Sequence, residues 1–307
     1  MKLTDHVYFY QRRVPSSNTT VIKANEQIII DPGVSTELSR LFRLMRRDGL
    51  SPEDTTQIWL THAHPDHAQA ARAMQHTCKI ICHPKGREVL ESVSPLGTFL
   101  RKQIYEVHPI LKLFFATKPW AVTFFESILT IDTWFIAKCI TPIWRGVKIH
   151  ETFKEAKIDV GIPIKVIFLP GHCPSGIGFW LANDSILIIG DLVALKNSGP
   201  VIGVNTALSD LNDSIKSLEK MKELKPSILL AGHGRMINEP DVVLHKSLEK
   251  LYEYKKKTIA YMEQGTKFWQ VTKRIWGDLP PGIMGQKWLW VAILGKMLWQ
   301  EGLLQSS

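Results

Sequence analysis

The sequence contains few cysteines, no long uninterrupted apolar run and no long run of one charge. Four cysteines in 307 residues do not suggest a disulfide framework, and we expect them to pack as small buried side chains in a reducing compartment. The longest uncharged stretch, Val166 to Asn183, contains prolines and glycines that an ordinary membrane helix would not carry. We therefore expect neither a disulfide scaffold nor a transmembrane segment.

The beginning of the chain lacks the pattern of a secretory signal. Residues Met1 to His6 show no basic segment followed by an apolar one, so we expect no secretory signal. Hydrophobic residues make up 45% of the chain and charged residues 22%, values close to the globular average, which argues against disorder. These features predict a globular cytoplasmic protein built as one large domain, or as a domain with an appendage.

The formal net charge of +9 does not identify a partner. It would attract nucleic acid, CoA thioesters, phosphorylated metabolites or an anionic membrane surface. A cationic surface that only keeps the protein in solution explains the charge equally well. The open hypotheses are a small-molecule substrate with apolar and anionic parts, nucleic acid, and a second copy of the chain in a homodimer.

Strand and helix patterns alternate along most of the sequence. Segments rich in β-forming residues at 7–10, 20–23 and 27–30 precede a helical spacing of apolar residues from Ser35 to Asp48. Further strands are expected at 58–60, 79–82, 164–169, 178–181, 186–189 and 227–230, with helices over 68–75 and 209–224. Such alternation is typical of an α/β fold.

Two regions depart from this alternation. Residues 99–144 hold ten of the chain's 28 aromatic residues with a helical spacing. We interpret a region of about 97–150 as a helical, aromatic-rich insertion that serves as a packing layer, a substrate cap, a dimer interface or a membrane contact. After residue 240 the strand patterns stop and helices are expected over 242–264, 268–276 and 286–300. We therefore divide the chain into a domain over 1–240 and a small helical appendage over 241–307.

Residues that can bind metals are concentrated in one short segment. His62, His64, Asp66 and His67 lie within six residues, on a loop that connects a predicted strand to a predicted helix. Imidazole and carboxylate groups suit zinc, iron or manganese, and ligands on one tight loop can face two ions. This segment predicts a metal site, for which zinc is our first choice and iron or manganese are alternatives.

Three more candidate ligands follow predicted strands. His172 comes after a Leu-Pro-Gly turn, Asp191 after Ile-Ile-Gly, and His233 lies between glycines. Small neighbours allow ligands from separate strands to approach one another. These residues are the further donors that a site for two divalent ions needs.

These motifs resemble those of the metallo-β-lactamase superfamily. Residues 62–67 match its H-x-H-x-D-H motif, the three later ligands follow in its order, and Asp31 in Ile-Asp-Pro-Gly matches its first motif. The resemblance spans about residues 7–240 and implies a four-layer αββα sandwich. It also implies two metal sites, one formed by His62, His64 and His172 and the other by Asp66, His67 and His233, with Asp191 bridging them. Asp31 is expected to orient a ligand or its loop.

The same resemblance implies hydrolysis by a hydroxide that bridges two metals, with Asp66 orienting the hydroxide or accepting its proton. The region after residue 240 resembles the short winged-helix-like C-terminal segment found in the lactamase-like, glyoxalase II-like branch. Two features depart from the family pattern. Ala68-Gln69-Ala70 replaces a frequent Gly-Gly pair, and the gap between His67 and His172 is unusually long.

Because a fold does not define a substrate, three functions stay open. The aromatic region favours an ester-type bond, in a thioester or a lactone with an apolar acyl part. The alternative is a phosphodiesterase or ribonuclease acting on nucleic acid, suggested by the net charge and by basic residues of the tail, namely Lys255, Lys256, Lys257, Lys273 and Arg274. The third is a non-catalytic protein that keeps the metal site for stability or sensing.

Overall fold

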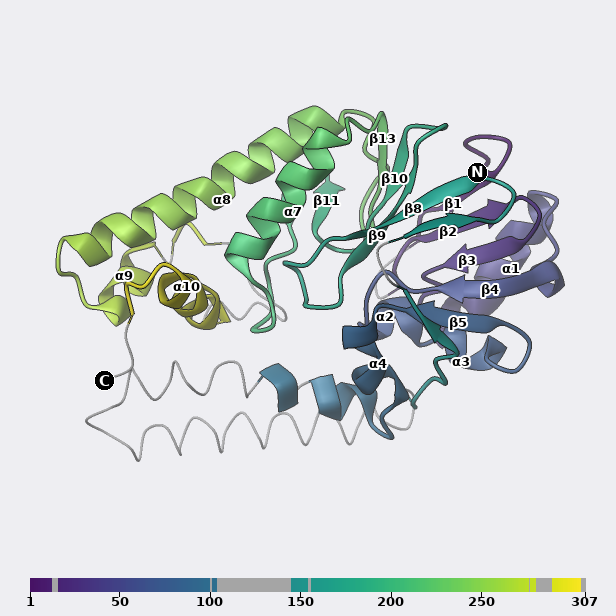
Figure 1. The fold of residues 1–307 in the computed structure, drawn as a ribbon, viewed down its shortest axis with the longest axis horizontal. Helices are drawn as coiled ribbons and strands as arrows, with labels where there is room; N and C mark the ends of the chain where they lie inside the picture. Colours follow the sequence, from purple (N-terminus) through teal and green to yellow (C-terminus); the bar gives the residue numbers. More distant parts are fainter. Residues whose placement is uncertain are drawn as a thin grey trace.

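A computed structural model describes residues 1–12, 16–99, 101–103, 145–153, 156–275, 277–279 and 289–304. Most of the insertion predicted over 97–150 lies outside these ranges, so its helical character and its role stay predictions. Within the described residues, two sheets face each other and helices lie on their outer sides (Figure 1).

The first sheet has the order β1-β2-β3-β4-β5-β6. Its antiparallel part is the predicted β-meander of β1 (Val7–Tyr10), β2 (Thr19–Lys23) and β3 (Gln27–Ile30). The parallel part continues from β3 through β4 (Thr55–Trp59), β5 (Lys79–Cys82) and the short β6 (Glu151–Thr152). All residues of β1 and β3 are buried, which is expected for strands covered on both faces.

The second sheet has the order β13-β10-β9-β8-β7. Its strands are β7 (Lys157–Asp159), β8 (Pro163–Phe168), β9 (Ile177–Leu181), β10 (Ile186–Ile188) and β13 (Ile228–Leu230). A separate hairpin of β11 (Val193–Lys196) and β12 (Gly199–Ile202), which the sequence patterns did not predict, follows β10. Strands β10 and β13 are parallel neighbours, so both end at the same edge of the sheet.

Apolar side chains fill the space between the sheets and under the helices. Trp59 of the first sheet lies 5.0 Å from Phe179 of the second and 5.3 Å from Phe153, measured between ring centroids. Helix α1 (Leu38–Arg47) covers the outer face of the first sheet, and α7 (Leu211–Glu223) covers the second. This helix–sheet–sheet–helix arrangement confirms the predicted four-layer α/β sandwich.

Short helices connect the strands of the first sheet: η1 (Ser35–Glu37), η2 (Pro52–Asp54), α2 (Pro65–Ala68), α3 (Ala71–Met74) and α4 (Pro84–Glu91). The prediction of one continuous helix over 68–75 was wrong, because α2 ends at Ala68 and α3 begins only at Ala71. The amide of Ala70 donates to the carbonyl of Gly33 at 2.8 Å, which interrupts the helical hydrogen bonding. The break attaches this segment to the loop after β3.

Among the described residues from 240 onward, three helices are present, as the sequence predicts: α8 (Pro240–Glu263), α9 (Phe268–Ile275) and α10 (Leu289–Gln300). Leu244 and Leu251 of α8 share one hydrophobic core with Leu218 of α7, and Trp290 of α10 lies 5.3 Å from Tyr254. The division into two domains at residue 240 stays a prediction. Among the described residues, no helix combines the length and apolarity needed to cross a membrane.

Three of the cysteines lie in the described part of the chain. Cys78, Cys82 and Cys173 are all free and buried. This confirms, for these three, the expectation that they pack as small core side chains. Cys139 lies outside the described residues.

Candidate metal centre

The loop after β4 brings four ligand candidates to the edge of the first sheet. Leu60 extends the strand pairing to Ile81 by one hydrogen bond, and the chain then turns into α2 at Pro65. Proline at the first helical position has no amide hydrogen to leave unsatisfied, which favours the helix start here. His62, His64 and His67 are buried on this turn, and Asp66 is partly exposed.

The other three candidates come from the second sheet and its connections. His172 follows β8, Asp191 follows β10 and His233 follows β13. The loop of His233 requires glycine at position 232. A Cβ atom there would lie only 2.3 Å from Asp191 Oδ1 and 2.5 Å from a carbon of the His67 ring. The sequence therefore allows a close approach that a larger residue would block.

His62, His64 and His172 form what we call the tri-histidine group. Together with Asp191 they offer ligand atoms that all lie within 4.8 Å of one another. His172 Nε2 is 2.9 Å from His64 Nδ1, while His172 Nδ1 donates to the carbonyl of Gly203 at 2.5 Å. This last bond fixes the ring so that Nε2 faces the group.

Asp66, His67 and His233 form what we call the mixed group, to which Asp191 also belongs. Their ligand atoms again lie within 4.8 Å of one another. His233 Nε2 is 2.9 Å from Asp66 Oδ2 and 3.3 Å from Asp191 Oδ2, and His67 Nε2 is 3.2 Å from Asp191 Oδ1. Asp191 is thus the one carboxylate shared by both groups.

Asp31 lies behind the mixed group and contacts one of its histidines. Its Oδ2 accepts a hydrogen bond from His67 Nδ1 at 2.8 Å and another from the Thr61 hydroxyl at 2.6 Å. Its Oδ1 accepts the Thr61 amide at 2.9 Å. A carboxylate on Nδ1 fixes the histidine tautomer that presents Nε2 to a metal. The sequence analysis expected Asp31 to orient a ligand or its loop, and the bond to His67 is a contact through which it could do so.

The two groups have opposite electrostatics. Burial lowers the pKa of all three histidines of the tri-histidine group, that of His64 to about 3. Burial also acts to lower the pKa of His67 and His233, but the carboxylates around them outweigh it. Asp191 and its neighbours raise the pKa of His67 well above its usual value and that of His233 to about 9. The first group therefore presents neutral imidazoles and the second holds protons.

Several buried polar atoms at this point lack a hydrogen-bond partner among the described residues. They are His62 Nε2, His64 Nε2, His67 Nε2 and Asp191 Oδ1. The last two lie 3.2 Å apart as an ion pair, without the geometry of a hydrogen bond. An unsatisfied buried polar atom costs about 1–3 kcal/mol, so a protein rarely gathers several without a ligand. Imidazole nitrogens and a carboxylate are the donor set of divalent transition metals. The His and Asp residues are thus positioned for metal binding.

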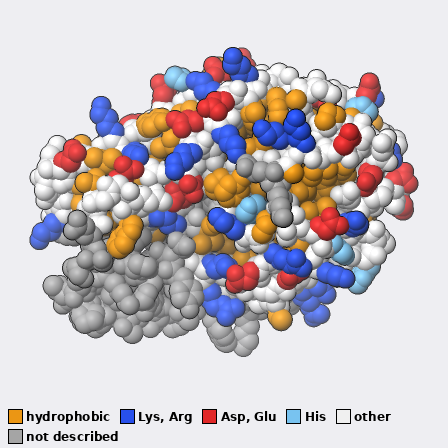
Figure 2. Space-filling view, in the orientation of Figure 1, with side chains coloured by type: hydrophobic (Ala, Val, Ile, Leu, Met, Phe, Trp, Pro, Cys, Tyr) orange, Lys and Arg blue, Asp and Glu red, His pale blue; other side chains and the backbone are white. Residues whose placement is uncertain are grey.

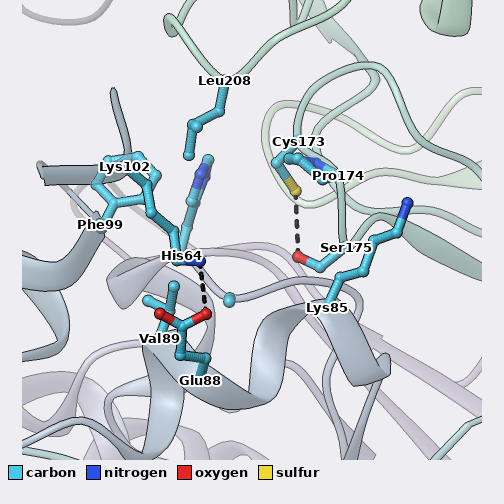
Figure 3. A pocket seen from close by; sticks show the side chains of 11 residues that line it. His64, Lys85, Glu88, Val89, Phe99, Lys102, Cys173, Pro174, Ser175 and Leu208 are labelled. Carbon is cyan, nitrogen blue, oxygen red and sulfur yellow. Dashed lines mark hydrogen bonds and ion pairs between the residues drawn. The ribbon is translucent and has the colours of Figure 1, made fainter. Parts of the chain in front are cut away.

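A pocket of about 490 Å³ adjoins His64 (Figure 3). Its apolar wall includes Val89, Phe99 and Leu208, and the Phe99 ring lies 4.8 Å from the His64 ring. Three charged residues also line it, namely Lys85, Glu88 and Lys102, of which Glu88 and Lys102 form an ion pair at 2.7 Å. The pocket therefore offers a largely apolar surface beside the tri-histidine group.

All seven ligand candidates lie in one place, but sequence reasoning missed residues that support them. Thr61 and Asn18 are both buried polar residues that bond to the loops around the ligands. The available signal for Asn18 was a run of polar residues, Ser16 to Thr19, directly before an apolar strand. Polar residues at that position are typical of an exposed turn, so only the structure reveals their burial.

Comparisons with a family model and with curated proteins point to the same protein family. The family model described as the metallo-beta-lactamase superfamily matches residues 12–233. Among curated proteins, the chain is 24% identical over 246 residues to the probable metallo-hydrolase YqjP of Bacillus subtilis, a match covering 75% of this chain and 70% of that protein. It is 23% identical over 154 residues to the beta-lactamase-like protein 2 homolog of Caenorhabditis elegans, a match that covers 50% of each protein.

Solved structures show the same fold. The crystal structure of the metallo-beta-lactamase family protein TTHA1429 from Thermus thermophilus superposes with a TM-score of 0.66. That match covers 98% of this chain and 95% of the other at 17% sequence identity. A metallo-beta-lactamase from Pontibacter korlensis matches with a TM-score of 0.54, over 82% of this chain and 97% of the other, at 15% identity.

Proposed function

The chain belongs to the metallo-beta-lactamase superfamily, and from this premise we propose that it is a hydrolase with two divalent metal ions that cleaves an ester-type bond. The substrate class we propose is a thioester or lactone with an apolar acyl part. The observation that carries this proposal is the pair of ligand groups sharing Asp191, beside an apolar-walled pocket.

The residues that would hold the two ions follow from the two groups. His62, His64 and His172 would bind one ion, Asp66, His67 and His233 the other, and Asp191 both. Zinc is our choice because of the many imidazole donors, with iron and manganese as alternatives. When bound, two such cations lower the pKa of a water molecule and stabilise the negative charge that develops on the scissile group.

Asp66 is the side chain that we propose to handle the proton. Burial acts to raise its pKa, but the contacts with His67 and His233 outweigh burial and hold the pKa below the usual value. Its carboxylate is therefore ionised at neutral pH and can orient a water molecule by accepting a hydrogen bond from it. Because a lowered pKa weakens the carboxylate as a base, it would hold a proton taken from that water only transiently. Asp31 supports this arrangement by keeping the Nδ1 proton of His67 in place.

The pocket beside His64 supports an apolar acyl part. Its volume of about 490 Å³ falls within the range of small-molecule sites. A chain that packs against Val89, Phe99 and Leu208 would place its carbonyl at the edge shared with His64. Each CH₂ group so buried contributes about 0.8 kcal/mol, which favours longer chains until the pocket is full.

The test is hydrolysis of an acyl-CoA chain-length series and a lactone panel by the metal-replete protein. We expect kcat/KM to rise with chain length and then level off, and turnover to vanish in His64→Ala. Leu208→Trp should shift the optimum to shorter chains without changing metal content, whereas Val93→Trp adds the same side chain at a position that is 91% exposed and should change neither. Absence of turnover across acyl-CoA, acyl-glutathione and lactone substrates would remove the proposal.

Phosphodiester cleavage in nucleic acid is the second candidate, because the net charge is +9. On the face shown in Figure 2, basic and acidic side chains are interspersed, and apolar side chains gather near its centre. Nucleic-acid binding through phosphates must weaken steeply as salt increases. Binding that is absent or insensitive to salt would exclude this candidate. A metal-loaded protein inert toward both esters and phosphodiesters would instead support a non-catalytic role.

A further inference from the structure

Residues 16–19, Ser-Ser-Asn-Thr, are polar yet buried, each with less than 5% of its surface exposed. Buried polar groups need hydrogen-bond partners, and the partners of a buried segment show what it holds in place. We call these four residues the polar segment. Its first three residues lie in the connection between β1 and β2, and Thr19 is the first residue of β2, at the edge of the first sheet where the mixed group assembles.

Asn18 forms hydrogen bonds with the loop that carries His233, both before and after this histidine. Its side-chain Nδ2 donates to the carbonyl of Ala231 at 2.9 Å and to that of Gly234 at 3.0 Å. Its backbone amide donates to the carbonyl of Gly232 at 2.6 Å. One residue therefore contacts the chain before and after His233, across more than two hundred residues of sequence.

The same segment also binds the loop of Asp66 and the loop of Asp31, the residue that orients His67. The Ser17 amide donates to the carbonyl of Asp66 at 3.0 Å, and the Thr19 hydroxyl donates to that of Asp31 at 2.8 Å. Asn18 Oδ1 accepts the amide of Arg12 at 2.8 Å, and Arg12 Nη1 donates to the carbonyl of Pro32 at 3.0 Å. The loops of Asp31, Asp66 and His233 thus share one set of anchors.

His172 of the tri-histidine group has different supports. Its carbonyl accepts the Ser209 hydroxyl at 2.9 Å, and its Nδ1 donates to Gly203 at 2.5 Å. In the part of the chain that the structure describes, no hydrogen bond of the polar segment reaches the His172 loop. The bonds that Asn18 donates all go to the loop of His233, so this residue acts on the side of the mixed group.

We propose that Asn18 is a positioning residue for the ion of the mixed group, which it serves by setting the distance of His233 from Asp66 and His67. This inference rests on the proposed two-metal function. The physical reason is that the His233 loop contains Gly232 and Gly234, the latter at φ +79°, so its backbone has little stiffness of its own. Ligands must be held within about 0.5 Å to bind a metal well, and the Asn18 amide provides that restraint.

The experiment titrates metal-depleted full-length protein with Zn²⁺ against a competing chelator and determines the affinity for each ion. For Asn18→Ala we expect the affinity for one ion to fall about 10–100-fold, the range seen for residues that orient ligands, while the other ion binds as in the wild type. Asn18→Asp keeps the side-chain shape and the Oδ1 acceptor but loses the two N–H donors. It should show the same selective loss of affinity for one ion, and it replaces the alanine variant in the experiment if that variant does not fold.

Gln27→Ala is the matched control. Gln27 is an equally buried amide whose Nε2 bridges Ser51 and Thr55, away from the metal ligands, at 2.6 and 3.0 Å. We expect a comparable loss of thermal stability and unchanged metal affinities. Unchanged affinities in the Asn18 variants, an equal loss for both ions, or an equal effect of Gln27→Ala would each overturn the inference. A wild-type protein that binds fewer than two ions would contradict the proposed two-metal function itself.

Discussion

The tri-histidine group and the mixed group face the same carboxylate but differ in how they would accept a metal. Burial keeps His62, His64 and His172 neutral, so their nitrogens are available without loss of a proton. His67 and His233 lie among carboxylates that raise their pKa values, so in the metal-free protein they hold protons that a cation must displace. The comparison teaches that ligand identity alone does not define a site, because neighbouring charges decide its protonation.

The supports of the two groups differ as well. The mixed group depends on Asp31 and on the polar segment, whereas His172 depends on Gly203 and Ser209. Asn18 bonds to the loop of His233, and Gly203 and Ser209 bond to His172, so substitutions at Asn18 or around His172 should affect one ion at a time. Asp191 and the Asp31–Thr61 pair touch both groups, because the Thr61 hydroxyl lies 3.0 Å from His62 Nδ1. This expectation makes the comparison testable.

The largest effect is expected for Asp191→Ala, because this carboxylate is common to both groups. Its removal also leaves His67 and His233 without their strongest counter-charge. Both ions should bind more weakly, and turnover should fall by more than the about 10–100-fold cost of losing a residue that only orients a ligand. Elemental analysis after gel filtration, together with kcat/KM, measures this. A variant that retains both ions would break the proposed sharing.

A matched pair of ligand substitutions comes next. His172→Ala should lose one ion and keep the other, and His233→Ala should do the reverse, because each histidine belongs to one group only. Metal content and Co²⁺ absorption spectra of the two variants should therefore differ from each other. If both variants show the same spectrum, the two groups do not act as separate sites.

Asp31→Asn should have a smaller effect that is unequal for the two ions. The amide can turn either its oxygen or its nitrogen toward His67 Nδ1, but it no longer supplies a negative charge. The affinity for the ion of the mixed group should fall about 10–100-fold. The other ion should lose less, because Asp31 reaches its group only through Thr61, whose hydroxyl lies 3.0 Å from His62 Nδ1. Chelator competition measures both affinities, and an equal loss of both ions would contradict this expectation.

The last prediction changes the pH and leaves the sequence intact. Below about pH 9, a cation that binds the mixed group must displace the proton of His233, so its affinity should rise as pH increases from 6 to 9. The gain is about tenfold per pH unit for each proton displaced. The tri-histidine group, with the pKa of His64 at about 3, should bind with little pH dependence over this range. Titrations at several pH values distinguish a sloped affinity from a flat one, and two flat affinities would contradict the assignment.

The elements that sequence patterns predicted well are those whose signal is local. The strands over 7–10 and 27–30 are short runs rich in β-forming residues, and the helix from Ser35 carries a helical spacing of apolar residues. Helix α8 begins within two residues of its predicted start. The hairpin of β11 and β12 was missed because its strands are short and lie close together. The predicted helix over 68–75 was wrong because Ala70 bonds to the distant Gly33, which no local propensity shows.

The candidate site divides in the same way. The sequence by itself determined the segment from His62 to His67, because four ligand types within six residues need only one tight turn to come together. It also marked His172, Asp191 and His233 as strand-end residues. Only the tertiary structure decided that these seven meet and that Asp31 and Asn18 hold one side, because contacts between residues far apart in sequence depend on how two sheets pack. The protonation of each histidine was decided there too, since burial and neighbouring charge exist only in the folded chain.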